Sequence, residues 1–146
     1  MVAVRENPSL TIVRRLKANP ERVWRALTQA EELKRWFYPT PGFTVLHAEA
    51  DLRVGGRFNI VVRSPDGETH DVSGVYREIV PHRKVVHTWA WKNTPERESL
   101  VTFELRADAG GTQLTLRHEQ FFDDEARDKH RHGWTGCLDT LEKLLG

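Results

Sequence analysis

The sequence predicts an α+β fold in which one curved antiparallel sheet packs against a long C-terminal helix. Three observations predict this class. From residue 43 to residue 119 the chain reads as strands joined by short turns, which is typical of an antiparallel meander. From Asp123 to Leu145 the hydrophobic period becomes helical, and this is the only helix long enough to cover the sheet. Residues 10–37 supply one strand and two short helices, which completes the order β-α-α-β-β-β-β-β-β-α.

The first strand is expected at residues 10–18, where Ile12 and Val13 give β character. A helix follows directly, because Asn19 is a favourable N-cap and Pro20 suits the first helical position. The residues around Asn19 therefore mark the end of a strand and the start of a helix.

A second short helix is expected to begin near Thr28, because Thr28 and Glu31 have the spacing of a capping box. Its apolar edge consists of Leu33, Trp36 and Phe37. The segment YPTPG at residues 38–42 should end this helix, since two prolines cannot continue it.

Alternating apolar residues identify the strands of the meander. His87, Trp89 and Trp91 share one face of a strand, and His118 lies on the apolar face of the last strand. The turns SPDG and DAGG separate strands through proline and glycine chemistry. Five of about six strands are RFNIVV (57–62), THDVSGVYREIV (69–80), KVVHTWAW (84–91), SLVTFELRA (99–107) and TQLTLRHE (112–119).

The C-terminal helix divides its histidines between two faces. At about 100° per residue, His130 falls within the apolar sector and His132 falls nearly opposite. The two therefore cannot bind one metal ion, because ligands on a helix need a spacing of three or four residues. The members of the apolar sector are Ala126, His130, Trp134, Cys137, Leu138, Leu141, Leu144 and Leu145.

Two inward-facing histidines, His118 and His130, leave three alternatives open. They could form a metal site with Cys137, but we predict no metal. They could be hydrogen-bonded groups in a mixed apolar interior, which we favour because buried polar groups usually find partners. They could also be the few polar groups of a ligand pocket.

Composition excludes several classes of protein. The net charge of the 146 residues is +1, and the basic residues are dispersed, so we expect no nucleic-acid partner. No run approaches the roughly 18 apolar residues needed to span a bilayer, so we expect no membrane insertion. Cys137 is the only cysteine, which excludes an internal disulfide. With no apolar N-terminal signal, the chain is expected to be cytoplasmic and to form one domain over residues 1–146.

Five segments of the chain together carry a family likeness. They are ANPERVWRALTQAEELKRWFYP, ADLRVGGRF, SGVYREIVPHRKVVHTWAW, ESLVTFEL and TQLTLRHEQFFDDEARDKHRHGWTGCLDTLEKLL. In this series the chain resembles the heat-shock-protein-90 ATPase activator-like branch of the START-like (SRPBCC, or Bet v-type) superfamily. No single motif is specific, but the series covers nearly all of residues 10–145 in family order.

The resemblance implies a helix-grip fold, with a hydrophobic cavity between the sheet and the C-terminal helix. In the superfamily such cavities take lipids, polyketides or flavonoid-like compounds. The residues expected to line the cavity are Trp36, Phe37, Phe58, Ile60, Tyr76, Trp89, Trp91, Phe103, His118, Phe121, His130, Trp134, Cys137 and Leu138.

Binding of a small hydrophobic molecule is the favoured function, without a cofactor. The alternative is a cyclase or lyase that uses His118 or His130 as acid–base, with Tyr76 as its partner. The residues themselves do not show a catalyst, so whether the protein is an enzyme stays open, with binding preferred. The further alternative is a co-chaperone that activates a chaperone ATPase, but a chaperone partner is not expected, because the chain adds no client- or chaperone-binding domain. An exposed sheet edge would permit a homodimer.

Overall fold

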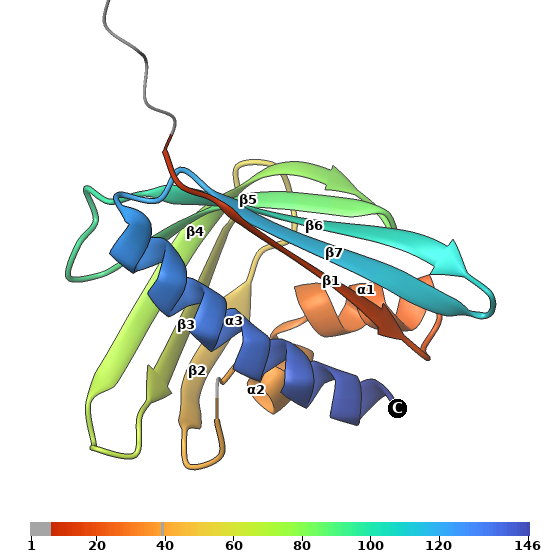
Figure 1. The fold of residues 1–146 in the computed structure, drawn as a ribbon, viewed down its shortest axis with the longest axis horizontal. Coiled ribbons are helices and arrows are strands. Elements are labelled where there is room, and N and C mark those ends of the chain that lie inside the picture. Colours follow the sequence, from red (N-terminus) through yellow and green to blue (C-terminus); the bar gives the residue numbers. More distant parts are fainter. Residues whose placement is uncertain (1–6, 39) are drawn as a thin grey trace, which may run out of the picture.

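The computed structural model of the protein describes residues 7–38 and 40–146. The described residues form one antiparallel sheet of seven strands, which curves around the last helix (Figure 1). The elements are β1 (Leu10–Leu16), α1 (Pro20–Thr28), α2 (Ala30–Trp36), β2 (Thr44–Ala50), β3 (Arg57–Arg63), β4 (Thr69–Val80), β5 (Lys84–Trp91), β6 (Ser99–Asp108), β7 (Gly111–Glu119) and α3 (Asp124–Leu145). This is the predicted helix-grip order, and the fold prediction is confirmed.

The sheet order is β1-β7-β6-β5-β4-β3-β2. Strands β2 to β7 form the predicted meander, in which each strand pairs with the next along the chain. The first strand joins the other end of this meander, so that Leu10 lies opposite His118 and Leu16 opposite Thr112. This long-range pairing brings the N-terminal strand against α3.

The start of α1 has the predicted cap. The Asn19 side chain accepts a hydrogen bond from the backbone N–H of Arg22 over 2.9 Å, with Pro20 at the first turn. The predicted capping box at Thr28 is wrong. Thr28 is the buried last residue of α1, and its hydroxyl donates to the Trp24 carbonyl over 2.7 Å. Since that hydroxyl is already used, α2 begins after Gln29 without a side-chain cap.

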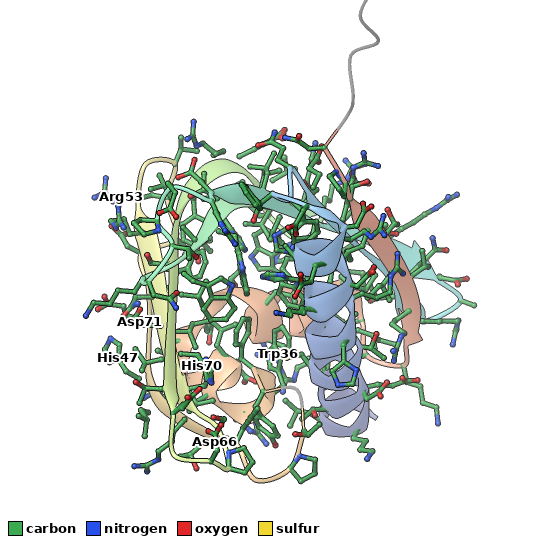
Figure 2. The ribbon with its side chains drawn as sticks, turned by 60° about the vertical axis from the view of Figure 1, so that its left-hand side comes forward. Trp36, His47, Arg53, Asp66, His70 and Asp71 are labelled. Atoms are coloured by element: carbon green, nitrogen blue, oxygen red, sulfur yellow. The ribbon has the colours of Figure 1, made fainter. Side chains whose placement is uncertain are left out.

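Helix α2 ends at Trp36, as the proline-rich segment predicts, although Pro39 itself lies outside the described residues. Trp36 is almost fully buried, and its indole N–H donates to the Ala26 carbonyl of α1 over 2.7 Å. Figure 2 shows Trp36 in the interior between the sheet and α3, whereas Arg53 lies at the outside of the molecule. This indole bond joins the two short helices.

The long helix presents the predicted stripe to the sheet. The Asp123 side chain caps its start by accepting from the Ala126 backbone N–H over 2.8 Å. Its buried residues are Trp134, Cys137, Leu138 and Leu141, whereas His132 is exposed. The sheet and α3 thus enclose one continuous apolar core.

Within residues 7–38 and 40–146, no helix has the length and apolar character needed to cross a membrane.

Candidate functional site

A cavity of about 390 Å³, the inner cavity, lies between the sheet and α3. Its wall is mostly apolar and aromatic, with two histidines and one lysine among the lining side chains. These are Phe37, Phe43, Val62, His70, Trp89, Trp91, Lys129, His130, Gly133, Trp134 and Cys137. Apolar walls with few polar groups are typical of small-molecule sites.

Six of the residues expected around a cavity line this one. They are Phe37, Trp89, Trp91, His130, Trp134 and Cys137. Eight others are buried but do not line it: Trp36, Phe58, Ile60, Tyr76, Phe103, His118, Phe121 and Leu138. The apolar period predicts which side chains point inward, but close packing fills most of the interior. Where the space stays open depends on contacts between distant elements.

The expected lining set did not include five residues that line the cavity: Phe43, Val62, His70, Lys129 and Gly133. His70 lies directly opposite Val62 in the pairing of β3 with β4. Its position two residues before buried Val72 is the signal that could have found it, because alternate residues share a strand face. Lys129 and Gly133 flank His130 and Trp134 along α3, a proximity that the apolar sector alone does not reveal.

The wall of the inner cavity is built around Trp89. The centroid of its ring lies 5.1 Å from that of Trp134, 5.8 Å from that of Phe37 and 5.5 Å from that of Trp91. Tilted and edge-on ring pairs at these separations are favourable beyond simple burial. The aromatic wall is thus continuous across β5, α3 and the end of α2.

His118 is fully buried, and both of its ring nitrogens have partners. The Trp134 indole N–H donates to Nδ1 over 3.0 Å. Since an indole nitrogen is only a donor, Nδ1 carries the lone pair and Nε2 the proton. The protonated Nε2 therefore donates to the Ser99 hydroxyl oxygen, 2.7 Å away. The Ser99 hydroxyl in turn donates to the Trp89 carbonyl. Burial, with a smaller contribution from His130, lowers the pKa of His118 well below its usual value.

His130 lines the inner cavity and is held in the other tautomer. Its Nε2 accepts from the Trp91 indole over 2.9 Å and from the Trp89 indole over 3.3 Å. The proton therefore sits on Nδ1, which donates to the Ala126 carbonyl over 2.7 Å. Burial lowers the pKa of His130, and its ring centroid lies 5.1 Å from that of His118. The two histidines meet in the interior, but only His130 faces the cavity.

His87 and Tyr76 form a cross-strand pair with ring centroids 5.8 Å apart. The His87 Nδ1–H donates to the Thr88 carbonyl over 2.9 Å, and burial lowers the pKa of His87 to about 4. Burial, together with the charge of Asp51, raises the pKa of Tyr76 to about 12. Tyr76 therefore stays protonated at neutral pH. Neither residue lines the inner cavity.

These hydrogen bonds limit the chemistry of the site. The lone pairs of His118 and His130 are both used by indole N–H groups, so neither of these two imidazoles has a lone pair free for a proton or a metal ion. Burial raises the pKa of the Cys137 thiol and so disfavours the thiolate that metals bind. The described residues contain no cluster of three or more His, Cys, Asp or Glu placed to hold a metal ion. The site is thus a mostly apolar cavity in which both inward histidines are held by indole hydrogen bonds.

Gly133 lies near the middle of α3 and lines the inner cavity. A Cβ placed on it would meet no atom within 4 Å. We therefore expect Gly133→Ala to raise the free energy of unfolding by about 1 kcal/mol, because glycine costs that much in a helix interior. Urea denaturation measures the change. A loss of stability would contradict the open space seen at this position.

Fold and cavity together define the class of protein. A curved antiparallel sheet that grips a C-terminal helix, with two short helices at one end, is a helix-grip domain. The model of the family described as Activator of Hsp90 ATPase homolog 1-like protein matches residues 17–146. The chain belongs to this family. No curated protein sequence matches it.

Solved structures of bacterial proteins share the fold over nearly the whole chain. A protein from Rhizobium leguminosarum is 32% identical, with a TM-score of 0.82 and coverage of 96% of this chain and 95% of that one. Protein CV1439 from Chromobacterium violaceum is 29% identical (TM-score 0.82; coverage 94% and 96%). The AHSA1 protein SPO3351 from Silicibacter pomeroyi is 28% identical (TM-score 0.83; coverage 94% and 97%).

Proposed function

We propose that the protein binds a small hydrophobic ligand in the inner cavity. The observation that carries the proposal is an open apolar space of about 390 Å³ in an otherwise close-packed interior. Five aromatic side chains form much of its wall: Phe37, Phe43, Trp89, Trp91 and Trp134. Filling such a space removes apolar surface from water on both the protein and the ligand, which drives binding.

The size of the cavity favours a compact ligand. Small-molecule sites range from about 300 to 1,000 Å³, and the inner cavity lies near the lower end. A flat ring system, as in polyketides and flavonoid-like compounds, suits the aromatic wall better than a long lipid chain does.

A thermal-shift screen tests this proposal. Flavonoids, aromatic polyketides and lipids are added separately, and the melting temperature is recorded against concentration. A ligand present at 100 times its Kd stabilises the folded state by about 2.7 kcal/mol. We expect ring compounds to raise the melting temperature and lipids to raise it less. No shift with any of the three classes would contradict ligand binding.

A matched pair of variants locates the ligand. Gly133→Met places a side chain in the inner cavity, whereas Thr135→Met places the same side chain on the exposed side of α3. We expect the Gly133 variant to abolish the thermal shift and the Thr135 variant to retain it. Loss of the shift in both, or in neither, would place the ligand elsewhere.

The family description also names activation of the Hsp90 ATPase. That role is tested by adding the protein to the chaperone and measuring ATP hydrolysis, with a pull-down on the chaperone's middle domain. We expect no stimulation and no pull-down if ligand binding is the function. Stimulation that survives Gly133→Met would instead support a chaperone role.

A further inference from the structure

A second space, the outer cleft, adjoins the inner cavity beside the start of α3 and has a volume of about 1020 Å³. Five residues line both spaces: His70, Trp89, Trp91, Lys129 and His130. Because they share these walls, a ligand seated in the inner cavity has the outer cleft as its immediate neighbour. The two spaces differ in chemistry, since charged residues gather along the outer cleft.

Two of the segments that line the outer cleft are distant in the sequence. The loop between β5 and β6 contributes Lys92 and Arg97, and the connection into α3 contributes Phe122 and Asp123. Figure 1 shows this loop beside the N-terminal end of α3. The Arg97 guanidinium carbon lies 4.0 Å from the centroid of the Phe122 ring, a cation–π contact that joins the two segments.

The carboxylates among the cleft residues are already engaged. Asp71 accepts from the Asn59 side-chain amide over 2.6 Å. Asp123 accepts from the backbone N–H of Ala126 over 2.8 Å, as the cap of α3. Glu125 pairs with Lys129 over 3.1 Å. Each acid therefore has a structural partner within the fold.

Two of the cations have no such partner. Among the described residues, no carboxylate lies within 4.0 Å of the Lys92 amine or the Arg97 guanidinium. Glu98, the acidic neighbour of Arg97, reaches Arg77 over 4.0 Å and does not line the cleft. Lys92 and Arg97 are both exposed to solvent. The cleft thus offers two cationic side chains without an ion-pair partner next to an apolar cavity.

We propose that the ligand is an amphipathic anion, with its apolar body in the inner cavity and an acidic group in the outer cleft near Arg97 and Lys92. This inference rests on the proposed function and deepens it. The guanidinium, held against the Phe122 ring, presents its remaining N–H donors to a carboxylate, sulfonate or phosphate. An uncharged analogue of the same shape keeps the apolar contacts and loses the charge-assisted bonds.

Two fluorescent compounds that differ only in the end group test the inference. Pyrenebutyrate carries a carboxylate, and pyrenebutanol carries a hydroxyl on the same body. We expect the acid to bind about tenfold more tightly than the alcohol at low salt. The preference should shrink as ionic strength rises, because salt screens exposed charges. Sodium acetate alone is the third arm and should give no thermal shift, since it lacks the apolar body.

Charge-removing variants identify the residues. Arg97→Gln and Lys92→Gln should each weaken binding of pyrenebutyrate by about threefold to tenfold and leave pyrenebutanol unchanged. Lys17→Gln removes an exposed positive charge from the far end of β1, next to α1, and should change neither. Both compounds should lose binding in Gly133→Met, because that side chain fills the inner cavity.

The outcomes separate this inference from the proposed function. If pyrenebutyrate and pyrenebutanol bind equally well and both lose binding in Gly133→Met, the proposal of an acidic ligand group is overturned. Binding of a hydrophobic ligand in the inner cavity is then still supported. A rise in melting temperature with sodium acetate alone would also overturn the proposal of an amphipathic anion, because it would indicate a site for a free anion. Failure of both pyrene compounds to bind would overturn the ligand class assigned to the cavity.

Discussion

Replacing His118 by leucine should lower the free energy of unfolding by about 2 to 3 kcal/mol. Leucine fills much of the imidazole volume but cannot accept the Trp134 indole N–H, which lies 3.0 Å from His118 Nδ1. Trp134 is 3% exposed, so no solvent replaces the lost acceptor. Leaving a buried donor without an acceptor destabilises the folded state by the full desolvation penalty of that group, about 1 to 3 kcal/mol. Urea denaturation measures the difference.

A double-mutant cycle separates the hydrogen bond from packing. Trp134→Phe removes the donor, so the double variant His118→Leu with Trp134→Phe leaves neither group unpaired. We expect the free energy of unfolding of the double variant to be at least about 1 kcal/mol higher than the value obtained by adding the losses of the two single variants. The control His132→Leu, on the exposed side of α3, should change stability by less than about 0.5 kcal/mol. Additive losses at His118 and Trp134 would contradict a coupled pair.

Lowering the pH from 7.5 to 5.0 should destabilise the fold by about 2 kcal/mol or more. Burial lowers the pKa values of His87, His118 and His130, and that of His87 falls to about 4. These imidazoles stay neutral in the folded state, whereas the unfolded chain binds protons below about pH 6.5. Because the unfolded state then binds more protons, stability falls as the pH drops from about 6.5 toward the folded-state values.

Denaturation at a series of pH values measures this slope. His87→Leu removes one titrating group and should flatten the pH dependence by about 2 kcal/mol over that range, even if the variant is less stable at pH 7.5. His132→Gln, which changes an exposed histidine, should leave the slope unchanged. A fold equally stable at pH 5.0 and 7.5 would contradict the neutral state of the buried imidazoles.

Much of the fold could be predicted because the local signals agree with one another. The bounds of β4 and β5 are those that alternation and the turn at Pro81 indicate. Asn19 and Asp123 cap α1 and α3 as their side-chain chemistry predicts. Thr28 misled the prediction, because a threonine can bond either to the turn behind it or to the helix ahead. Tertiary burial decided between the two.

The site was less predictable, because it depends on contacts across the sheet and α3. Periodicity showed that His118 and His130 point inward, but it could not show which indole each would accept. Those bonds determine the tautomers and leave no lone pair free. The outer cleft depends on Arg97 meeting Phe122, 25 positions later, a contact that no local pattern encodes.

The pairing of β1 with β7 also governs the order in which the chain can fold during synthesis. Strands β2 to β6 can pair successively as each leaves the ribosome, because their partners are neighbours in sequence. Strand β1 emerges first, yet its partner follows roughly 100 residues later, a delay of about 5 to 20 s at typical elongation rates. Until then its apolar face is available to chaperones or to other nascent chains. Closure of the sheet by β1 and docking of α3 therefore have to wait until β7 and α3 have been synthesised, and these steps join the most distant segments.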